Sequence, residues 1–470
     1  PRTVYVFGER VDDFVSHPNI RPIVNAFMET YRLALKDEYR GVLTAFNEEG
    51  EEINRFLHVA KSREDLAKRV EMMRIVNGYI GTCNYRCAGH DALNALYAVT
   101  YEIDAKYGTE YHKRFKQFLR EAQKRDYAIT GAMTDVKGDR TKRPSEQKDP
   151  DVYLRVVEEK KDGIVVRGAK IHQSGAVAAD YMLVIPTRTM RPEEKQWSIA
   201  FAVPGDAEGL IYIHQWNSYE AKFLLRKEYE LDADLGNALY GIRGTGMVIF
   251  NDVFIPWSRV FMYGEAEFTA KLIEYFTAHH RGGGSGCKAG FGDVLIGAAA
   301  LAASYEGTEK ASHIRNKLAY MSYLNEKAYA IGLASAYKGV KTPSGAYIPD
   351  PLLSDVAKLS AADGFPEMLK TTADISGGLA VTGPSERDLK NPEIGAIVKK
   401  YLKTGEGIDV LNRLRVYRLI ENWVASPHML GAIQGGGPPQ TQIIGILRRT
   451  NFKAKMELAK RIAGIKEDYM

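Results

Sequence analysis

The chain has 470 residues, of which 45% are hydrophobic and 26% charged. These proportions are typical of a folded globular protein, and they exclude a disordered, collagen-like or small disulfide-stapled chain. The net charge is +5, from 64 Lys and Arg against 59 Asp and Glu. This weak excess does not predict a nucleic-acid partner, although it suits an anionic small molecule.

The start of the chain, PRTVY, leads into charged residues by Glu9, and the sequence has no run of 18 apolar residues. We therefore expect no secretory segment and no membrane span. The most apolar run, 294–303, is short and rich in Ala and Gly, which is typical of a packed helix. These features favour a cytoplasmic protein.

The first part of the chain has apolar residues at helical spacing, with charges between them. The segments are 17–39, 64–76, 91–107 and 112–125. Residues 134–151 then break the pattern with Gly, Pro and Asp, which indicates a loop or linker. We predict an N-terminal α-helical domain over residues 1–150.

Residues 152–262 contain short segments rich in β-branched and aromatic residues, separated by turn residues. This pattern predicts a middle domain over 151–265, built as a small antiparallel β-barrel or sandwich. Helical spacing returns near residue 266 and predicts a C-terminal α-helical bundle over 266–470. Helices on both sides of a block of strands indicate an α+β fold with segregated domains.

The three cysteines occur in two motifs. Cys83 and Cys87 form a C-x3-C pair, which on a helix would place both sulfurs on one face. Cys287 ends a Gly-rich stretch, expected to be a loop, that follows His279 and His280. Each motif alone is explained equally well by structural thiols or a flexible loop. Together they give three thiolates and one imidazole, a set that suits a structural zinc or an iron–sulfur cluster with one nitrogen ligand.

The sequence resembles the 4-hydroxybutyryl-CoA dehydratase and vinylacetyl-CoA isomerase family, within the 4-hydroxyphenylacetate 3-hydroxylase superfamily. The similarity covers nearly the whole length. It includes C-x3-C followed by AGHDALNAL, then DVKGDRTKRPSEQKDPD, GAKIHQSG, VFIPW, H-x6-C-K followed by AGFGDVLIGAAA, and GGGPPQ. The resemblance implies an acyl-CoA dehydrogenase-like fold, FAD and a [4Fe–4S] cluster as cofactors, and an acyl-CoA thioester as substrate.

The resemblance also assigns roles to individual residues. It implies that Cys83, Cys87, His280 and Cys287 hold the cluster, and the H-x6-C spacing selects His280 over His279. His280 would also act as a base, and Lys288 would tune the site. The residues implied for flavin binding are Met133, Thr134, Lys137, Arg140, His172, Gln173, Ser174, Gly435 and Gly436. Lys137 and Arg140 can meet a pyrophosphate, and the polar side chains can hydrogen-bond the ring or ribitol.

The implied reaction is the removal of water from a hydroxyacyl thioester. The β hydrogen of such a thioester is hardly acidic, so ordinary base chemistry fails and a radical route is implied. The sequence departs from the family pattern at four places. Gly284 replaces a tyrosine, Gly431 and Thr245 or Gly246 replace glutamates, and Tyr85 replaces a glutamine. A small residue at 284 enlarges the pocket, so we hypothesise a paralogue with a different or bulkier substrate.

Two further hypotheses stay open. One is a flavin-dependent aromatic hydroxylase of the same superfamily, which has no need of the cysteines. The other is a non-catalytic cluster-binding or redox-sensing paralogue, because several acid and base groups are missing. The resemblance also implies a homotetramer assembled through the C-terminal helices.

Overall fold

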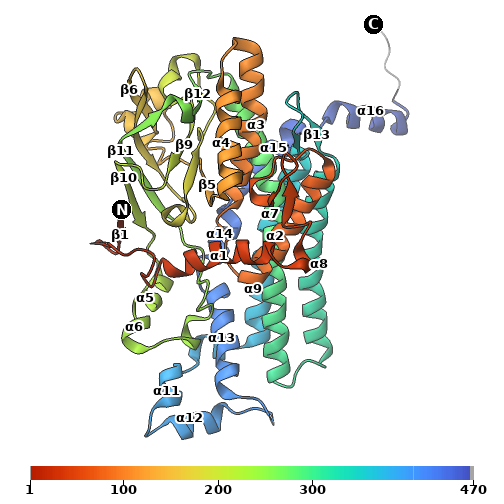
Figure 1. The fold of residues 1–470 in the computed structure, drawn as a ribbon. Coiled ribbons are helices and arrows are strands. Elements are labelled where there is room, and N and C mark those ends of the chain that lie inside the picture. Colours follow the sequence, from red (N-terminus) through yellow and green to blue (C-terminus); the bar gives the residue numbers. More distant parts are fainter. Residues whose placement is uncertain (1, 406, 466–470) are drawn as a thin grey trace.

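A helical part and a sheet part lie side by side in the computed structural model, which describes residues 2–405 and 407–465 (Figure 1). The N-terminal helices are α1 (Arg21–Ala34), α2 (Arg63–Ile80), α3 (Cys87–Tyr107) and α4 (Tyr111–Arg125). The predictions of helices in these regions are confirmed. Helix α2 begins at an N-cap serine, Ser62, and ends at Gly81, whose φ of 61° is the left-handed conformation that stops a helix.

The strands form two main sheets. The larger has the order β2 (Glu9–Arg10), β1 (Thr3–Val6), β10 (Leu210–His214), β11 (Gly246–Pro256), β7 (Gly163–Lys170) and β6 (Arg155–Glu159). The smaller has the order β12 (Val260–Tyr263), β9 (Ile199–Pro204), β8 (Tyr181–Val184) and β5 (Ile129–Ala132). Two short hairpins pair β3 (Thr44–Phe46) with β4 (Glu52–Asn54) and β13 (Val340–Lys341) with β14 (Tyr347–Ile348).

The expectation of one closed antiparallel barrel is not confirmed. The described strands form separate sheets, and β1 pairs with β10, and β5 with β8, in parallel. Strands β1 and β5 come from before residue 151, so long connections reach β10 and β8 and allow parallel pairing. The mixed helix-and-sheet architecture stands, whereas the division at residues 150 and 265 stays a prediction.

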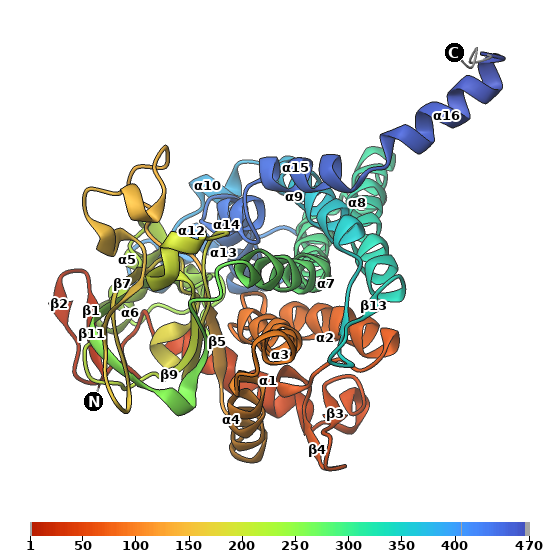
Figure 2. The ribbon, with the colours of Figure 1, turned by 90° about the horizontal axis from the view of Figure 1, so that it is seen from above.

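The remaining helices form the bundle and its outer layers. They are α5 (Ser218–Leu224), α6 (Arg226–Tyr229), α7 (Phe268–Tyr305), α8 (Ser312–Tyr337), α9 (Pro351–Ser376), α10 (Leu379–Thr382), α11 (Glu386–Lys390), α12 (Gly395–Leu402), α13 (Val410–Val424), α14 (His428–Gln434), α15 (Pro439–Arg449) and α16 (Phe452–Ala463). Seen from above, α7 lies at the centre, with α2 and α3 on one side and α8 and α9 on others (Figure 2).

The prediction of a Gly-rich loop before Cys287 is wrong, because residues 282–286 lie inside the 38-residue helix α7. Close packing explains the glycines. A Cβ on Gly286 would stand 2.0 Å from the carbonyl oxygen of Val70, and one on Gly290 would stand 2.4 Å from that of Arg74. The glycines therefore let α2 approach α7 closely, which compensates for their low helix propensity.

Helix α7 is long and apolar enough, by length and composition, to cross a membrane. However, 67% of its most apolar window is buried inside the protein. Such burial is what the central helix of a bundle requires, and it accounts for the apolar run in the sequence.

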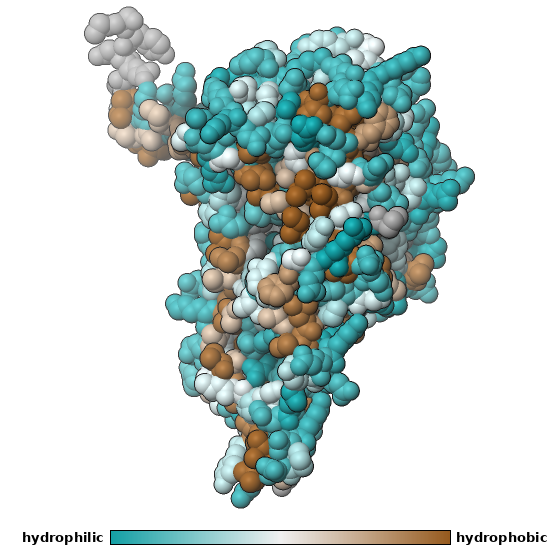
Figure 3. All heavy atoms as spheres, turned by 90° about the vertical axis from the view of Figure 1, so that its left-hand side faces the viewer, coloured by the Kyte–Doolittle hydropathy of each residue, from teal (hydrophilic) through white to brown (hydrophobic). Residues whose placement is uncertain are grey.

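The last described helix, α16, projects away from the rest of the molecule (Figure 2). None of its residues is buried, and Met456 and Ile462 are 58% and 81% exposed. Apolar side chains gather on this projection in the surface view (Figure 3). The helical spacing after residue 266 predicted helices in this part of the chain, and they are confirmed as α15 and α16.

Candidate active site and cofactor site

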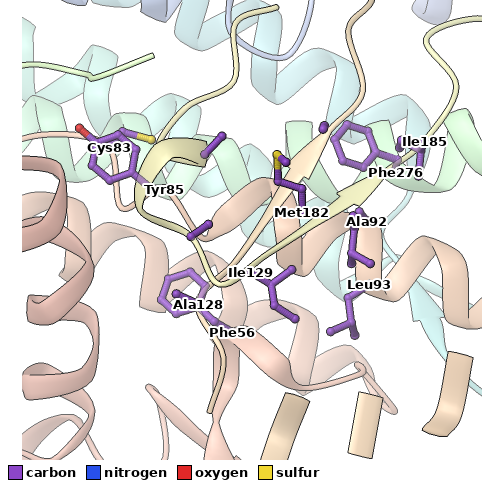
Figure 4. Close-up of a cluster of buried hydrophobic side chains, with 14 of the residues drawn as sticks. Phe56, Cys83, Tyr85, Ala92, Leu93, Ala128, Ile129, Met182, Ile185 and Phe276 are labelled. Carbon is purple, nitrogen blue, oxygen red and sulfur yellow. The ribbon is translucent and has the colours of Figure 1, made fainter. Parts of the chain in front are cut away.

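The C-x3-C pair lies at the junction of α2 and α3 and not on one helix. Cys83 is in the loop between them, and Cys87 is the first residue of α3. The side-chain oxygen of Asn84 accepts hydrogen bonds from the backbone nitrogens of Arg86 and Cys87, each at 3.0 Å. This bonding competes with helix formation and keeps the loop open. Figure 4 shows Cys83 and Tyr85 together at one end of a buried apolar cluster.

The three thiols lie close enough together for each to affect the pKa of another. A hydrogen bond from the Cys87 thiol lowers the pKa of Cys83 to about 6. Sharing that proton raises the pKa of Cys87 well above its usual range, and the charges of Cys83 and Cys287 contribute. Burial raises the pKa of Cys287, while nearby Lys288 and Arg243 oppose the rise. The site thus brings all three cysteines together beside cations that favour thiolates.

The imidazole of His280 is fixed by a buried carboxylate from α3. Its Nδ1 lies 2.8 Å from Oδ2 of Asp91, which is completely buried and also pairs with Arg69 at 3.0 Å. Despite burial, the charges of Arg69 and His280 lower the pKa of Asp91 to about 2. An ionised Asp91 makes Nδ1 of His280 the protonated nitrogen, so Nε2 carries the lone pair.

The neighbouring His279 has a different environment. It is buried, its Nε2 has no hydrogen-bond partner, and burial lowers its pKa to about 4. The carboxylate contact therefore belongs to His280, the histidine that the H-x6-C spacing selects.

An open space lies in front of Gly284, which is one helical turn after His280. A Cβ on this residue would meet no atom within 4 Å, in contrast to the glycines that pack against α2. Positions 280, 284 and 287 share one face of α7. Among the described residues no group of three or more His, Cys, Asp or Glu side chains is arranged to hold a single metal ion. The ligands of a cluster bind different irons and therefore stand further apart than the ligands of one ion.

The late glycine loop lies beside His280. A Cβ on Gly436 would lie 3.5 Å from Cδ2 of His280 and 3.4 Å from Cε of Lys358. Gly436 has a φ of 85°, which favours glycine. A Cβ on Gly435 would lie 3.1 Å from Nη1 of Arg243. The structure therefore brings Gly436 to the imidazole of His280 and Gly435 to Arg243.

The other residues predicted for flavin binding meet at the edge of the two sheets. The backbone oxygen of Thr134 accepts a hydrogen bond from Ile171, and Lys170 donates to the backbone oxygen of Met133. This pairing places 133–140 beside 170–174. The side chain of Gln173 donates to the backbone of Ile171, and the backbone oxygen of Ser174 accepts from Thr130.

Positive charge gathers at one end of these segments. Burial lowers the pKa of Lys137, and the charges of Arg140, Lys170 and Arg188 also lower it. His172 lies near Lys137 and is itself exposed. Neither Lys137 nor Arg140 belongs to an ion pair among the described residues. Unpaired cations beside flexible hydrogen-bonding groups fit a diphosphate.

The places where the sequence departs from the family pattern have distinct surroundings. The guanidinium of Arg243 donates a hydrogen bond to the backbone oxygen of Gly431 at 3.2 Å and so lies against that glycine. Thr245 donates to the side chain of Gln215. The hydroxyl of Tyr85 accepts from the backbone nitrogen of Gly244 at 3.0 Å. Tyr85 thereby ties the cysteine loop to the segment that carries Arg243.

Four residues at this site were not predicted, namely Arg69, Asp91, Arg243 and Lys358. Asp91 could have been predicted from the sequence, because it follows Cys87 by four residues on a helix and so lies on the same face as Cys87. Lys358 and Arg243 had none, since their contacts are with residues far away in the sequence.

Two family models for the 4-hydroxyphenylacetate 3-hydroxylase match the chain, the N-terminal model over residues 1–262 and the C-terminal model over 269–464. The chain therefore has the fold of this flavoenzyme group. It is 27% identical to the oxygenase component of 4-hydroxyphenylacetate 3-monooxygenase from Thermus thermophilus, over 89% of this chain and 84% of that protein. An oxygenase component of this kind, solved in complex with FAD, has a TM-score of 0.84 at 24% identity and covers 98% of this chain and 95% of that one.

The greater similarity is to a dehydratase. The 4-hydroxybutyryl-CoA dehydratase/vinylacetyl-CoA Δ-isomerase of Clostridium aminobutyricum is 43% identical over 98% of this chain and 96% of its own length. An oxygen-tolerant archaeal 4-hydroxybutyryl-CoA dehydratase from N. maritimus superimposes with a TM-score of 0.96 at 44% identity, over 100% of this chain and 93% of that one. The chain belongs to the 4-hydroxybutyryl-CoA dehydratase/vinylacetyl-CoA isomerase family of enzymes.

Proposed function

We propose that this enzyme uses FAD and a [4Fe–4S] cluster to dehydrate or isomerise a hydroxyacyl-CoA, either 4-hydroxybutyryl-CoA or a related, bulkier thioester. The observation that carries the proposal is the convergence of three thiols with an imidazole that a carboxylate orients. The dehydratase similarity supports the reaction class. The open space at Gly284 supports an acyl group larger than hydroxybutyryl.

The residues present fit a cluster. Cys83, Cys87 and Cys287 would hold three irons and Nε2 of His280 the fourth, while the space at Gly284 leaves room for a bulky group. When bound, the cluster would supply a Lewis acid for the leaving hydroxyl and the flavin would supply one-electron chemistry. Lys288 and Arg243 would balance the negative charge of the thiolates.

His280 can also move a proton. Asp91 holds the proton of Nδ1, so Nε2, when it does not hold the iron, can accept one from the α carbon of a thioester placed in the open space. Asp91 stabilises the imidazolium that results, and Arg69 keeps Asp91 ionised. The loop at Gly435–Gly436 lets backbone approach this space without a side chain in the way.

For the flavin, Lys137 and Arg140 would bind the diphosphate, and Thr134, Gln173 and Ser174 would bind the ring or ribitol. Met133 and His172 lie on the same two segments. Gly435 and Gly436 would approach the flavin from the thiol side. These assignments follow the family resemblance and the paired geometry of 133–140 with 170–174.

Cofactor content separates one alternative function from the proposal, and thioester turnover separates the other. The hydroxylase relatives favour a monooxygenase, which would carry flavin without iron. A cluster-binding paralogue without catalysis would carry both cofactors but convert no thioester. The exposed apolar residues of α16 support assembly of subunits, and we retain the homotetramer as a proposal.

The decisive test is purification without oxygen, followed by assays of iron, sulfide and flavin. We expect about four iron and four sulfide per chain together with FAD, since that is the composition of a cubane cluster. The Cys287→Ser variant should lose iron and keep flavin. Flavin without iron in the unmodified protein would contradict the proposal. Turnover of 4-hydroxybutyryl-CoA to crotonyl-CoA at a good rate would contradict the bulkier substrate alone.

A further inference from the structure

Buried basic side chains are almost always paired with carboxylates in this protein. The buried ones are Arg55, Arg69, Arg86, Lys170, Lys288, Lys358 and Arg418. All except Lys288 and Lys358 form an ion pair with an Asp. Among the described residues these two lysines have no carboxylate partner, although they are only 8% and 2% exposed. Burying a charge without a partner is costly, so this exception needs an explanation.

Both exceptions lie at the candidate active site. Lys358 comes from α9, and Lys288 and Arg243 are near enough to repel its charge. The Cys287 thiol lies near Lys288 and Arg243, so bound thiolates would neutralise those two cations. The one carboxylate among the groups that act on Lys358 is Asp363, and the described residues show no ion pair between the two. Lys358 therefore has no directly paired anion in the site.

Lys358 lies close to His280, the base in the proposed function. Its Cε and Cδ2 of His280 both face Gly436, at 3.4 and 3.5 Å from a Cβ placed there. Its Nζ donates to the backbone oxygens of Ala432 and Ile433, at 3.3 and 3.0 Å. These bonds fix the ammonium at the end of α14 and leave one of its three donors free.

We propose that the acyl group of the substrate carries a carboxylate of its own, and that Lys358 binds this carboxylate. The substrate class would then be the CoA monothioester of a hydroxylated dicarboxylic acid. The α carbon would lie at His280 and the distal carboxylate at Lys358, on either side of Gly436. This inference rests on the proposed function, because it requires an acyl-CoA in the site.

The test compares two saturated probes that differ in one group. Valeryl-CoA ends in a methyl, and glutaryl-CoA has the same chain length but ends in a carboxylate. We expect the holoenzyme to bind glutaryl-CoA at least about tenfold more tightly in calorimetry, as befits a charge-assisted hydrogen bond. Lys358→Met should remove this preference, and Lys358→Arg should retain part of it. Lys370→Met is the matched control, because Lys370 is on the same helix and its side chain is 79% exposed.

Three other results would each contradict either this inference or the proposed function. Equal affinity for the two probes would overturn the inference and leave the proposed function standing. A Lys358→Met variant that weakens both probes equally would show that Lys358 only supports the end of α14, which also overturns it. Failure of both probes to bind the unmodified holoenzyme would contradict the proposed function itself.

Discussion

Two regions of the site are held together in different ways. The first region, the thiol and imidazole groups, comes from parts of the chain that are distant in the sequence. The second region, the segments 133–140 and 170–174, is joined by backbone pairing at a sheet edge. At the first region, Asp91 and His280 are 189 residues apart and are joined by side chains alone. At the second region, a backbone bridge joins Asp135 to Lys170, and a buried ion pair at 2.9 Å reinforces it. The first region depends on charges to hold its shape, and the second has an independent backbone framework.

The largest effect should follow from breaking the charge network of the first region. Asp91→Asn removes the partner of Arg69 and the orienting group of His280 together. We expect a loss of about 3–5 kcal/mol in the free energy of unfolding, because a buried cation loses its partner. Urea denaturation measures it, and iron content should fall as well. Asp363→Asn, at an exposed position on α9, should change stability by less than about 0.5 kcal/mol.

The second region should tolerate removal of its ion pair when both partners are replaced. Lys170→Met alone leaves the buried carboxylate of Asp135 unpaired and should cost about 3 kcal/mol. The double variant Asp135→Leu, Lys170→Met should recover most of that loss, because the backbone pairing remains. Thermal unfolding of the three proteins gives the comparison. A double variant that is less stable than the single variant would show that the two regions depend on charge in the same way.

Helix packing at the first region should produce an intermediate effect. In Gly286→Ala the new Cβ would meet the backbone oxygen of Val70, so α2 must move away from α7, at a cost of about 1–3 kcal/mol. Gly297→Ala is the matched substitution on the same helix, where a Cβ meets nothing within 4 Å. It should raise stability by up to about 1 kcal/mol through helix propensity. Equal melting temperatures for the two variants would argue against the packing role of the glycines.

Near pH 6 the smallest effect should come from single buried histidines. Burial lowers the pKa of His58 to about 4 and that of His428 to about 3, against 6.5 for an exposed histidine. Below pH 6.5 the unfolded chain binds protons that the folded chain excludes, so stability is complete above pH 6.5 and declines as the pH falls toward 4. His58→Gln should reduce this decline by up to about 1.4 kcal/mol per pH unit. An unchanged slope between pH 6.5 and 4 would contradict this assignment.

The sequence was sufficient to predict the helices of the N-terminal part and the block of strands, because their apolar periodicities are regular. It was not sufficient for residues 282–286, where glycine suggested a loop. The glycines serve helix contact instead, and the partner atoms belong to Val70 and Arg69 on another helix. The parallel pairs could not be predicted either, since β1 and β5 pair with strands far along the chain.

For the site, the family resemblance selected the cysteines and His280, which the structure brings near one another. It could not find Arg69, Arg243 or Lys358, since a lone basic residue carries no signal in a sequence. Their significance appears only when burial and the absence of carboxylates are known. Binding of the two cofactors by the predicted residues stays a prediction.

The separation between Asp91 and His280 has a consequence for how the protein is made. At a synthesis rate of about 5–20 residues per second, the ribosome would take about 10–40 s to reach His280 after Asp91. During that time Cys83 and Cys87 emerge without Cys287, and the buried pocket that shields them does not exist. With the proposed cluster, loading of iron would follow translation of α7, and the early thiols would have to be kept reduced until then.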